Sequence, residues 1–140
     1  AYFYWTPSAL FAISAEYLFE EFEREDFFTS EEQVGELETH RFPLGVNFFH
    51  PSGLSASLKC TYIDQDGKFG SVPADYRYGE DRFWIFDTAV RYHLPKRLGI
   101  ITVGALNLFD NDDFDYQDMD LARRTIFPER TIYGKATFSF

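Results

Sequence analysis

The chain has 140 residues, a normal length for one domain, and a formal net charge of −10 at pH 7. The acidic balance excludes the basic stripe that binds nucleic acid, and the single cysteine, Cys60, excludes an internal disulfide and a cysteine metal cluster. Aromatic residues make up 20% of the chain, yet no run approaches the roughly 20 consecutive apolar residues of a membrane helix. Apolar residues are instead interleaved with polar ones, which is typical of strands with two different environments.

Turn signals divide the first third of the chain into alternating segments. Residues 1–5 are typical of the end of a strand, positions 6–8 predict a short turn, and residues 9–23 predict the next strand. The glutamates in that segment are compatible with a helix, but its alternation of phenylalanine, isoleucine and tyrosine favours a strand. Residues 24–36 are polar and acidic, so a loop is predicted there.

The middle of the chain predicts three further strands with the same alternation. They are expected at 37–49, 54–64 and 81–94. A tight turn at 51–53 joins the first two, and a long polar loop at 65–80 joins the second and third. The cysteine falls on an apolar position of its strand, where it would act as a small hydrophobe.

The last third of the chain predicts two more strands. A short turn at 95–97 is followed by a strand at 98–110, an acidic loop at 111–125 and a terminal strand that ends the chain. That terminal strand alternates strictly between apolar and polar residues. Its apolar positions are Ile132, Gly134, Ala136, Phe138 and Phe140, and its polar positions are Thr131, Tyr133, Lys135, Thr137 and Ser139.

Short and long connections alternate along the chain, which indicates an all-β, antiparallel, up-and-down meander. About six to seven strands are expected in one domain, residues 1–140, with the short turns on one side and the longer loops on the other, as in a transmembrane β-barrel. Open sheet edges cannot exist in lipid. The segment is therefore expected to be the C-terminal part of a larger barrel, or to close with other chains. An upstream region is also expected, because the chain begins without a signal peptide.

One stretch near the C-terminus carries a family resemblance. An alternating strand runs into Asn107-Leu108-Phe109-Asp110, an acidic loop with Phe114-Asp115-Tyr116 follows, and the final strand ends in Phe140. This order resembles the C-terminal barrel of TonB-dependent receptors, over roughly the last third of the chain. The resemblance implies location in the outer membrane of Gram-negative bacteria and uptake of a scarce solute such as an iron chelate. It implies outer-membrane lipid and TonB as partners, the latter through a plug and N-terminal region that these residues do not contain.

The terminal strand also resembles the signal that the barrel-assembly machinery reads in outer-membrane proteins. The residues that carry this likeness are Tyr133, Ala136, Phe138 and Phe140. Other large barrels end similarly, so an outer-membrane channel, or a polysaccharide-export porin linked to TPR repeats, is the alternative function. A plug domain upstream would select uptake, and TPR repeats would select export. A soluble β-sandwich is a further alternative, which extraction without detergent would identify.

Seven charged residues fall on polar positions of their strands: Glu16, Glu20, Arg41, Lys59, Asp87, Arg91 and Lys135. The functional interpretation is a lumen wall that contacts a plug or lines a solute path. The simpler interpretation, which we favour, is a ladder of ion pairs, because barrel interiors are generally polar. No serine nucleophile motif, phosphate loop or catalytic carboxylate pair is present, so no catalytic residue and no enzyme activity are predicted.

The acidic loop offers candidate metal ligands. Asp110, Asp112 and Asp115 are candidate calcium ligands, because calcium takes about six to eight oxygen ligands. The stretch lacks the glycine at the sixth position of an EF-hand loop, and a solvated loop without a cofactor is the simpler alternative. The three histidines, His40, His50 and His93, lack the spacing of zinc ligands, so no zinc site is expected.

Aromatic residues gather at two levels of the predicted strands. Those near the short turns are Trp5, Phe48, Tyr92 and Phe138, and those near the long loops are Tyr17, Phe19, Tyr62 and Trp84. Two belts of this kind are typical of the two interfaces of a membrane. The core of a soluble sandwich would instead place large aromatic residues in the middle of strands and inward.

Overall fold

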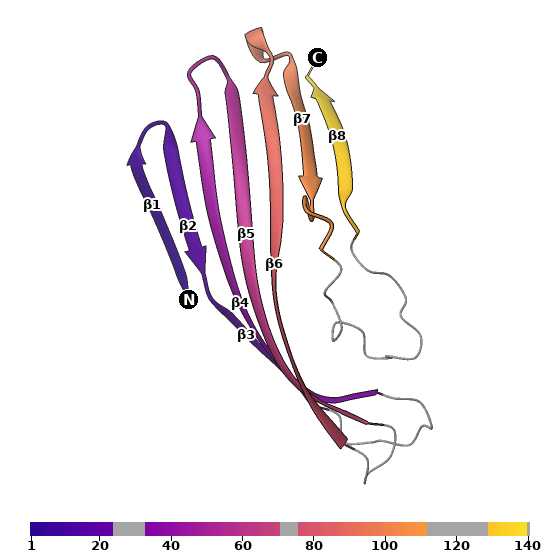
Figure 1. The fold of residues 1–140 in the computed structure, drawn as a ribbon. Coiled ribbons are helices and arrows are strands. Elements are labelled where there is room, and N and C mark those ends of the chain that lie inside the picture. The colour runs from indigo at the N-terminus through magenta and orange to yellow at the C-terminus, as the bar shows by residue number, and fades with distance from the viewer. Residues whose placement is uncertain (24–32, 71–75, 112–128, 140) are drawn as a thin grey trace.

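The structure, a computed structural model, describes residues 1–23, 33–70, 76–111 and 129–139. Within these residues every strand belongs to one antiparallel sheet, and no α-helix is present (Figure 1). A short 3-10 turn, η1 (Pro95–Arg97), lies between the sixth and seventh strands. The strands are β1 (Tyr2–Ser8), β2 (Phe11–Glu16), β3 (Leu18–Glu23), β4 (Gln33–Phe49), β5 (Leu54–Gly70), β6 (Tyr76–His93), β7 (Gly99–Leu106) and β8 (Thr131–Phe138).

Strands that are neighbours in the sheet are also neighbours in the sequence. Their order is β1-β2-β4-β5-β6-β7-β8, and β3 pairs with the same strand, β4, as β2 does. The predicted all-β, antiparallel, up-and-down arrangement is therefore confirmed. Within the described residues the sheet is not closed, because β1 and β8 form its two edges, so the closed barrel stays a prediction.

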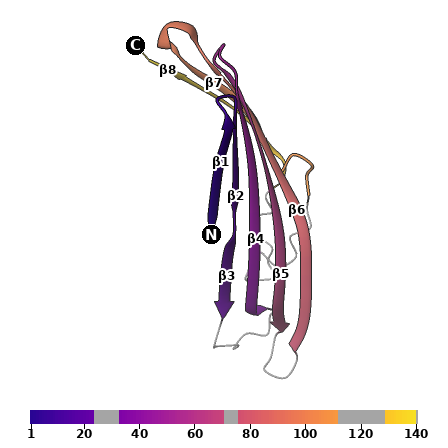
Figure 2. The same ribbon diagram turned by 90° about the vertical axis from the view of Figure 1, so that its left-hand side faces the viewer.

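Figures 1 and 2 show the sheet as a single curved and twisted layer, with no second layer of described residues on either face. The turns between β1 and β2, β4 and β5, and β6 and β7 lie at one end, together with the C-terminal end of β8 (Figure 1). We call this the short-turn end and the opposite end the long-loop end. The part of each strand nearest the short-turn end is called the short-turn half, and the part nearest the long-loop end is called the long-loop half.

The strands β4, β5 and β6 are 17, 17 and 18 residues long, and they extend beyond β7 and β8 at the long-loop end (Figure 1). The loops predicted at 24–36 and 65–80 are therefore longer than the segments that connect the strands. In the structure β4 begins at Gln33, β5 ends at Gly70 and β6 begins at Tyr76. Charge pairing across the strands accounts for the difference. Glu36 and Lys68 are register partners whose side chains form an ion pair of 3.2 Å. Opposite charges placed in this way stabilise a sheet.

The strand predicted at 9–23 is interrupted between β2 and β3, and Pro43 on β4 explains the interruption. The common register of β2 and β3 with β4 places Pro43 opposite Glu16. Further along β4, the N–H of Phe49 bonds to the carbonyl of Leu10 beside β2, with an N···O distance of 2.8 Å. Alternate residues of a strand point their N–H groups the same way, so the backbone nitrogen at position 43 faces Glu16, as that of Phe49 faces Leu10. Proline has no N–H, so the hydrogen bond from position 43 to Glu16 is missing.

The turns at the short-turn end are held tightly. The turn predicted at 6–8 lies two residues later, because β1 continues to Ser8, whose hydroxyl accepts the N–H of Leu10 at 3.2 Å. In the turn between β4 and β5, Gly53 has a φ of +89°, and its carbonyl accepts the N–H of His93 at 2.9 Å. A Cβ at position 53 would lie 2.9 Å from the carbonyl oxygen of His93, so both the conformation and the close approach require glycine.

Candidate membrane-facing surface

The strand register divides the side chains between two faces of the sheet. Residues directly opposite each other in an antiparallel sheet project from the same face. Leu58 lies opposite Val46 on β4 and Thr88 on β6, and its neighbour Lys59 lies opposite Asp87. We call the two surfaces the Leu58 face and the Lys59 face.

In the short-turn half, the Leu58 face is apolar apart from Thr88. Its side chains include Ile13, Ala15, Leu44, Val46, Leu54, Ala56, Leu58, Cys60, Val90, Ile101, Val103, Ile132 and Ala136. Leu58 keeps 47% of its surface exposed and Val103 keeps 56%. A contiguous apolar surface of this extent marks contact with a partner or with lipid.

A row of aromatic rings borders this apolar band on its long-loop side. The row consists of Tyr17, Phe42, Tyr62, Trp84 and Phe86, with successive ring centroids 5.0, 6.1, 4.9 and 6.4 Å apart. These separations lie in the range in which aromatic pairs attract each other. Phe19, which the sequence places in the same belt, contacts His40 one step further towards the long-loop end, at 5.0 Å. We call Tyr17, Phe42, Tyr62, Trp84 and Phe86 the long-loop aromatic row; Phe19 and His40 are not part of it.

Aromatic residues also border the apolar band on its short-turn side. The four residues predicted there, Trp5, Phe48, Tyr92 and Phe138, all project from the Leu58 face. Phe48, Tyr92 and Phe138 lie near the short turns, whereas the register places Trp5 at the level of Leu58, in the middle of the band. Phe11 joins them, with its ring centroid 5.2 Å from that of Phe48. The Leu58 face therefore has aromatic side chains on both sides of an apolar centre.

The apolar band has the width of a membrane-spanning strand. On β5 the band begins at Leu54 and ends at Tyr62, so it covers nine strand positions, from 54 to 62. A transmembrane β-strand needs about 9–11 residues tilted by about 45°. The match concerns the short-turn half only, since β5 continues to Gly70.

Beyond the long-loop aromatic row the Leu58 face becomes charged. Its side chains there include Glu21, Glu23, Glu36, Glu38, His40, Asp64, Asp66, Lys68, Glu80 and Arg82. Arg82 donates to the carboxylate of Asp64 at 3.0 Å. This hydrogen bond and the negative charge of Asp64 raise the pKa of Arg82, so the guanidinium stays charged. Exposed ion pairs of this kind add little to the stability of a fold, because water and salt screen them.

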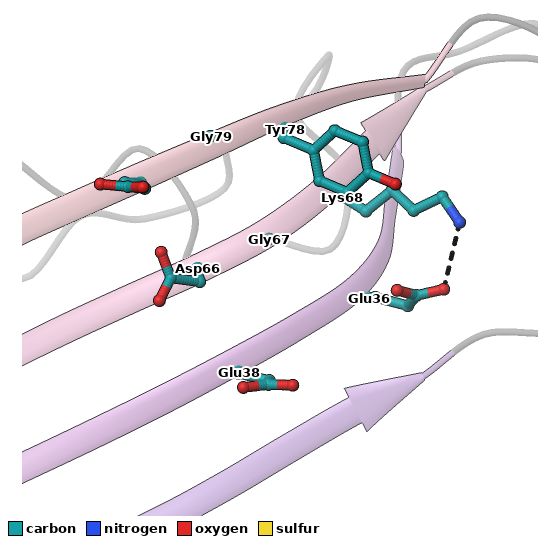
Figure 3. A pocket seen from close by; sticks show the side chains of 8 residues that line it. Glu36, Glu38, Asp66, Gly67, Lys68, Tyr78 and Gly79 are labelled. Carbon is teal, nitrogen blue, oxygen red and sulfur yellow. Dashed lines mark hydrogen bonds and ion pairs between the residues drawn. The ribbon is translucent and has the colours of Figure 1, made fainter.

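A shallow depression of about 260 Å³ lies among these charges (Figure 3). The carboxylates of Glu36, Glu38 and Asp66 come from adjacent strands, and the amine of Lys68 reaches Glu36, with Tyr78 beside it. Nowhere in the described ranges are three or more histidine, cysteine, aspartate or glutamate side chains placed to hold one metal ion. The depression is therefore an open, charged surface of the sheet.

The Lys59 face carries all seven charges that the sequence places on polar positions: Glu16, Glu20, Arg41, Lys59, Asp87, Arg91 and Lys135. Arg41 and Glu20 form an ion pair of 3.2 Å, and Lys59 is the register partner of Asp87. A depression of about 290 Å³ in the short-turn half is lined by polar residues that include Ser14, Glu16, Asn47 and Lys59. The short-turn half is thus apolar on one face and polar on the other.

In the long-loop half, the Lys59 face is the less polar one. Ile63 and Phe83 are each only 3% exposed, and Ile85 packs against them. The neighbouring Gln65 is buried, and its amide donates to the hydroxyl of Thr39 at 3.1 Å. On β5 and β6 the buried apolar side chains thus lie on the Lys59 face in this half, while the Arg41–Glu20 ion pair keeps charge on the same face beside them.

The family motif begins with a turn that ends β7 and returns the chain to β6. Asn107 is buried, and its N–H donates to the carboxylate of Asp87 at 3.0 Å. Its side-chain amide donates to the carbonyl of Asn111 at 2.7 Å and accepts the N–H of Asn111 at 3.0 Å. The N–H of Leu108 donates to the carbonyl of Phe86 at 2.7 Å. Asn107 has a φ of +46°, which asparagine tolerates better than most residues, so the motif has a clear structural reason.

Asp110, the last residue of the motif, holds the ends of the acidic loop together. Its carboxylate accepts the N–H of Arg130 at 2.8 Å, and the guanidinium of Arg130 lies 3.9 Å away. The other two candidate calcium ligands, Asp112 and Asp115, lie outside the described residues. Calcium binding by this loop stays a prediction.

The strand β8 holds three of the four residues likened to the assembly signal. Ala136 and Phe138 project from the Leu58 face, Tyr133 projects from the Lys59 face, and Phe140 lies outside the described residues. Tyr133 lies directly opposite Gly104. A Cβ on Gly104 would lie 2.6 Å from the tyrosine ring, so glycine at this position makes room for the aromatic side chain.

In the part of the chain that the structure describes, no helix is long and apolar enough to cross a membrane. The resemblance to a receptor family rests on the residues of the C-terminal third that are named above. Comparisons with protein-family models, with curated proteins and with solved structures found no match to this chain.

Proposed function

We propose that this chain forms part of the wall of a transmembrane β-barrel in the outer membrane of a Gram-negative bacterium. The Leu58 face would contact lipid, and the Lys59 face would line the barrel interior. The observation that carries the proposal is the apolar band on the Leu58 face, which covers nine positions of β5 from Leu54 to Tyr62 and has aromatic side chains on both sides. A water-soluble sandwich would cover such a face with a second sheet, and the described residues contain a single layer.

The barrel wall would belong to a TonB-dependent receptor that takes up a scarce solute such as an iron chelate. The turn at Asn107 and the terminal strand β8 support this assignment through the family resemblance. TonB would act through an N-terminal region, and the barrel-assembly machinery would read β8, with Tyr133, Ala136, Phe138 and Phe140 as its signal. No residue of the described sheet is assigned a catalytic role in this proposal.

The interior side of the sheet carries both apolar and charged residues. Ile63 and Phe83 are almost fully buried on the Lys59 face by other residues of this chain, in the long-loop half. Lys59 and Asp87 would contact whatever occupies the interior in the short-turn half.

The experiment that tests the proposal uses the full-length protein in its own outer membrane. We expect the protein to resist extraction by alkaline carbonate and to support growth on one member of a panel of ferric chelates under iron limitation. Growth should be lost when either this protein or TonB is removed. Recovery of the folded protein in the soluble fraction would contradict the membrane wall.

The alternative function gives a different result in the same experiment. An outer-membrane channel or a polysaccharide-export porin would also be found in the outer membrane. It would pass its solute, or export polysaccharide, equally well with and without TonB. Removal of TonB therefore separates the two functions.

A further inference from the structure

The polarity of the Leu58 face changes at one level on three adjacent strands. Phe42, Tyr62 and Trp84 are register partners on β4, β5 and β6, and they belong to the long-loop aromatic row. One step of the alternation further on, the register partners are His40, Asp64 and Arg82. On β5 and β6 aromatic side chains thus give way to charged ones within two residues, and on β4 the change is from a phenylalanine to a histidine.

On β5 and β6 the Lys59 face changes in the opposite sense at the same level, whereas Arg41 on β4, the register partner of Ile63, keeps an ion pair with Glu20 on that face. Lys59 is followed on its face by Thr61, then by Ile63 and then by Gln65. Ile63 is 3% exposed and packs against Phe83 on the next strand. Side chains alternate strictly between the faces of a strand, so only a change of surroundings explains a simultaneous change on both faces.

We infer that the long-loop aromatic row marks the edge of the hydrocarbon layer, and that the long-loop half of β4, β5 and β6 stands in water beyond the membrane. This inference rests on the proposed membrane wall and adds the depth at which the wall lies in the bilayer. Charged side chains on the lipid side of a barrel are unfavourable near the bilayer centre and are tolerated outside it. The Lys68–Glu36 and Arg82–Asp64 pairs would then be hydrated.

The projecting half has its apolar core on the inner side of the sheet. In the membrane, lipid covers the apolar side chains of the Leu58 face, and water is excluded without a protein core. Beyond the membrane the apolar side chains must turn away from water, and Ile63 and Phe83 do so by lying on the Lys59 face. The same strands thus pass from lipid into water without a break in the backbone hydrogen bonds between them.

Spin labels on single-cysteine variants of the full-length protein test the depth directly. Cys60→Ser provides the background, and the protein is folded into phosphatidylcholine vesicles. Leu58→Cys and Asp66→Cys place labels on the same strand and the same face, on either side of the proposed edge. Collisions with oxygen report lipid, and collisions with a water-soluble nickel chelate report water, for either orientation of the protein in the vesicle.

We expect the label at position 58 to collide several-fold more often with oxygen than with the nickel chelate, and the label at position 66 to show the reverse. Glu38→Cys, the register partner of position 66 on β4, should behave like position 66. Circular dichroism identifies folded variants. Glu80→Cys, also a partner of position 66, replaces any variant that fails to fold.

Two adverse results have different meanings. A label in lipid at positions 66 and 38 would overturn the proposed edge and leave the membrane wall intact. A label in water at position 58 of the folded protein would overturn the membrane wall itself. The reversal between positions 58 and 66 is the result that supports the inference.

Discussion

The two halves of β5 have the same backbone pairing and opposite chemistry. Between Leu54 and Tyr62 the apolar side chains lie on the Leu58 face, whereas beyond Tyr62 the buried Ile63 lies on the Lys59 face, against Phe83 of β6. Alternation identifies a strand in both halves, but it does not say which face meets which surroundings. The comparison teaches that a long strand keeps one secondary structure while its surroundings change along its length.

Deleting a ring from the inner cluster should have the largest effect on stability. Phe83→Ala should lower the free energy of unfolding by about 3–5 kcal/mol, because a buried ring is lost and a cavity remains. Trp84→Ala, on the next residue and the opposite face, should cost less, because Trp84 is already 45% exposed. Urea unfolding of the full-length protein in vesicles measures both. Equal costs would remove the distinction between the faces in the long-loop half.

A charge in the apolar band should have the next largest effect. Leu58→Arg should cost about 2–4 kcal/mol if the site lies near the bilayer midplane. Asp66→Arg on the same strand and face is the matched control, and it should change stability by roughly 0.5 kcal/mol or less, as exposed positions do. The same unfolding titrations measure both variants. A large cost at position 66 would show that the two halves share one environment.

Gly104 on β7 and Gly134 on β8 lie on opposite faces of the sheet, so alanine substitutions at these two positions compare the space available on each face. Gly104→Ala should cost about 1–3 kcal/mol, because the added methyl group overlaps the ring of Tyr133. Gly134→Ala is the control, since no atom lies within 4 Å of a Cβ built there. The unfolding midpoint should fall for the first variant and stay unchanged for the second. Tyr133→Ala should rescue Gly104→Ala only in part, because the added Cβ also lies 2.8 Å from the backbone carbonyl oxygen of Thr88; no rescue at all would show that the tyrosine ring is not the cause.

The charged surface of the long-loop half should contribute least. In a double-mutant cycle, the coupling between Lys68 and Glu36 should lie between about 0 and 1 kcal/mol, because water and salt screen an exposed pair. Raising the salt concentration should reduce it further. A coupling well above this range that is insensitive to salt would place the pair in a dry environment, contrary to the comparison of the two halves.

Much of the fold is predictable from the sequence, because the alternation and the short turns are local features. The strand order, the antiparallel pairing and the predicted positions of Tyr62, Trp84 and Phe48 in two aromatic belts follow from that pattern. The break at Pro43 was not predicted. It depends on which neighbouring strand the missing N–H faces, and that is known only once the register is known.

The long-loop half could not be predicted for a different reason. Glu36, Asp64 and Lys68 indicate a polar loop when each segment is considered alone. In the structure these residues lie in strands, where each is paired with a residue of a neighbouring strand. Such pairs join residues far apart in the sequence, so no single segment reveals them. Phe42 and Phe86 were missed from the long-loop aromatic row because membership depends on the level of a residue in the sheet, which again requires the register.

The contact between Asp110 and Arg130 has a consequence for how this part of the chain can evolve. The hydrogen bond of 2.8 Å joins the segment that follows β7 to the segment that precedes β8. For a chain with fixed ends, each doubling of the intervening length adds only about 0.6 kcal/mol of closure entropy. Insertions, deletions and new recognition sequences between these two anchors are therefore inexpensive for the sheet. Selection can vary this segment while the strands on either side stay constant.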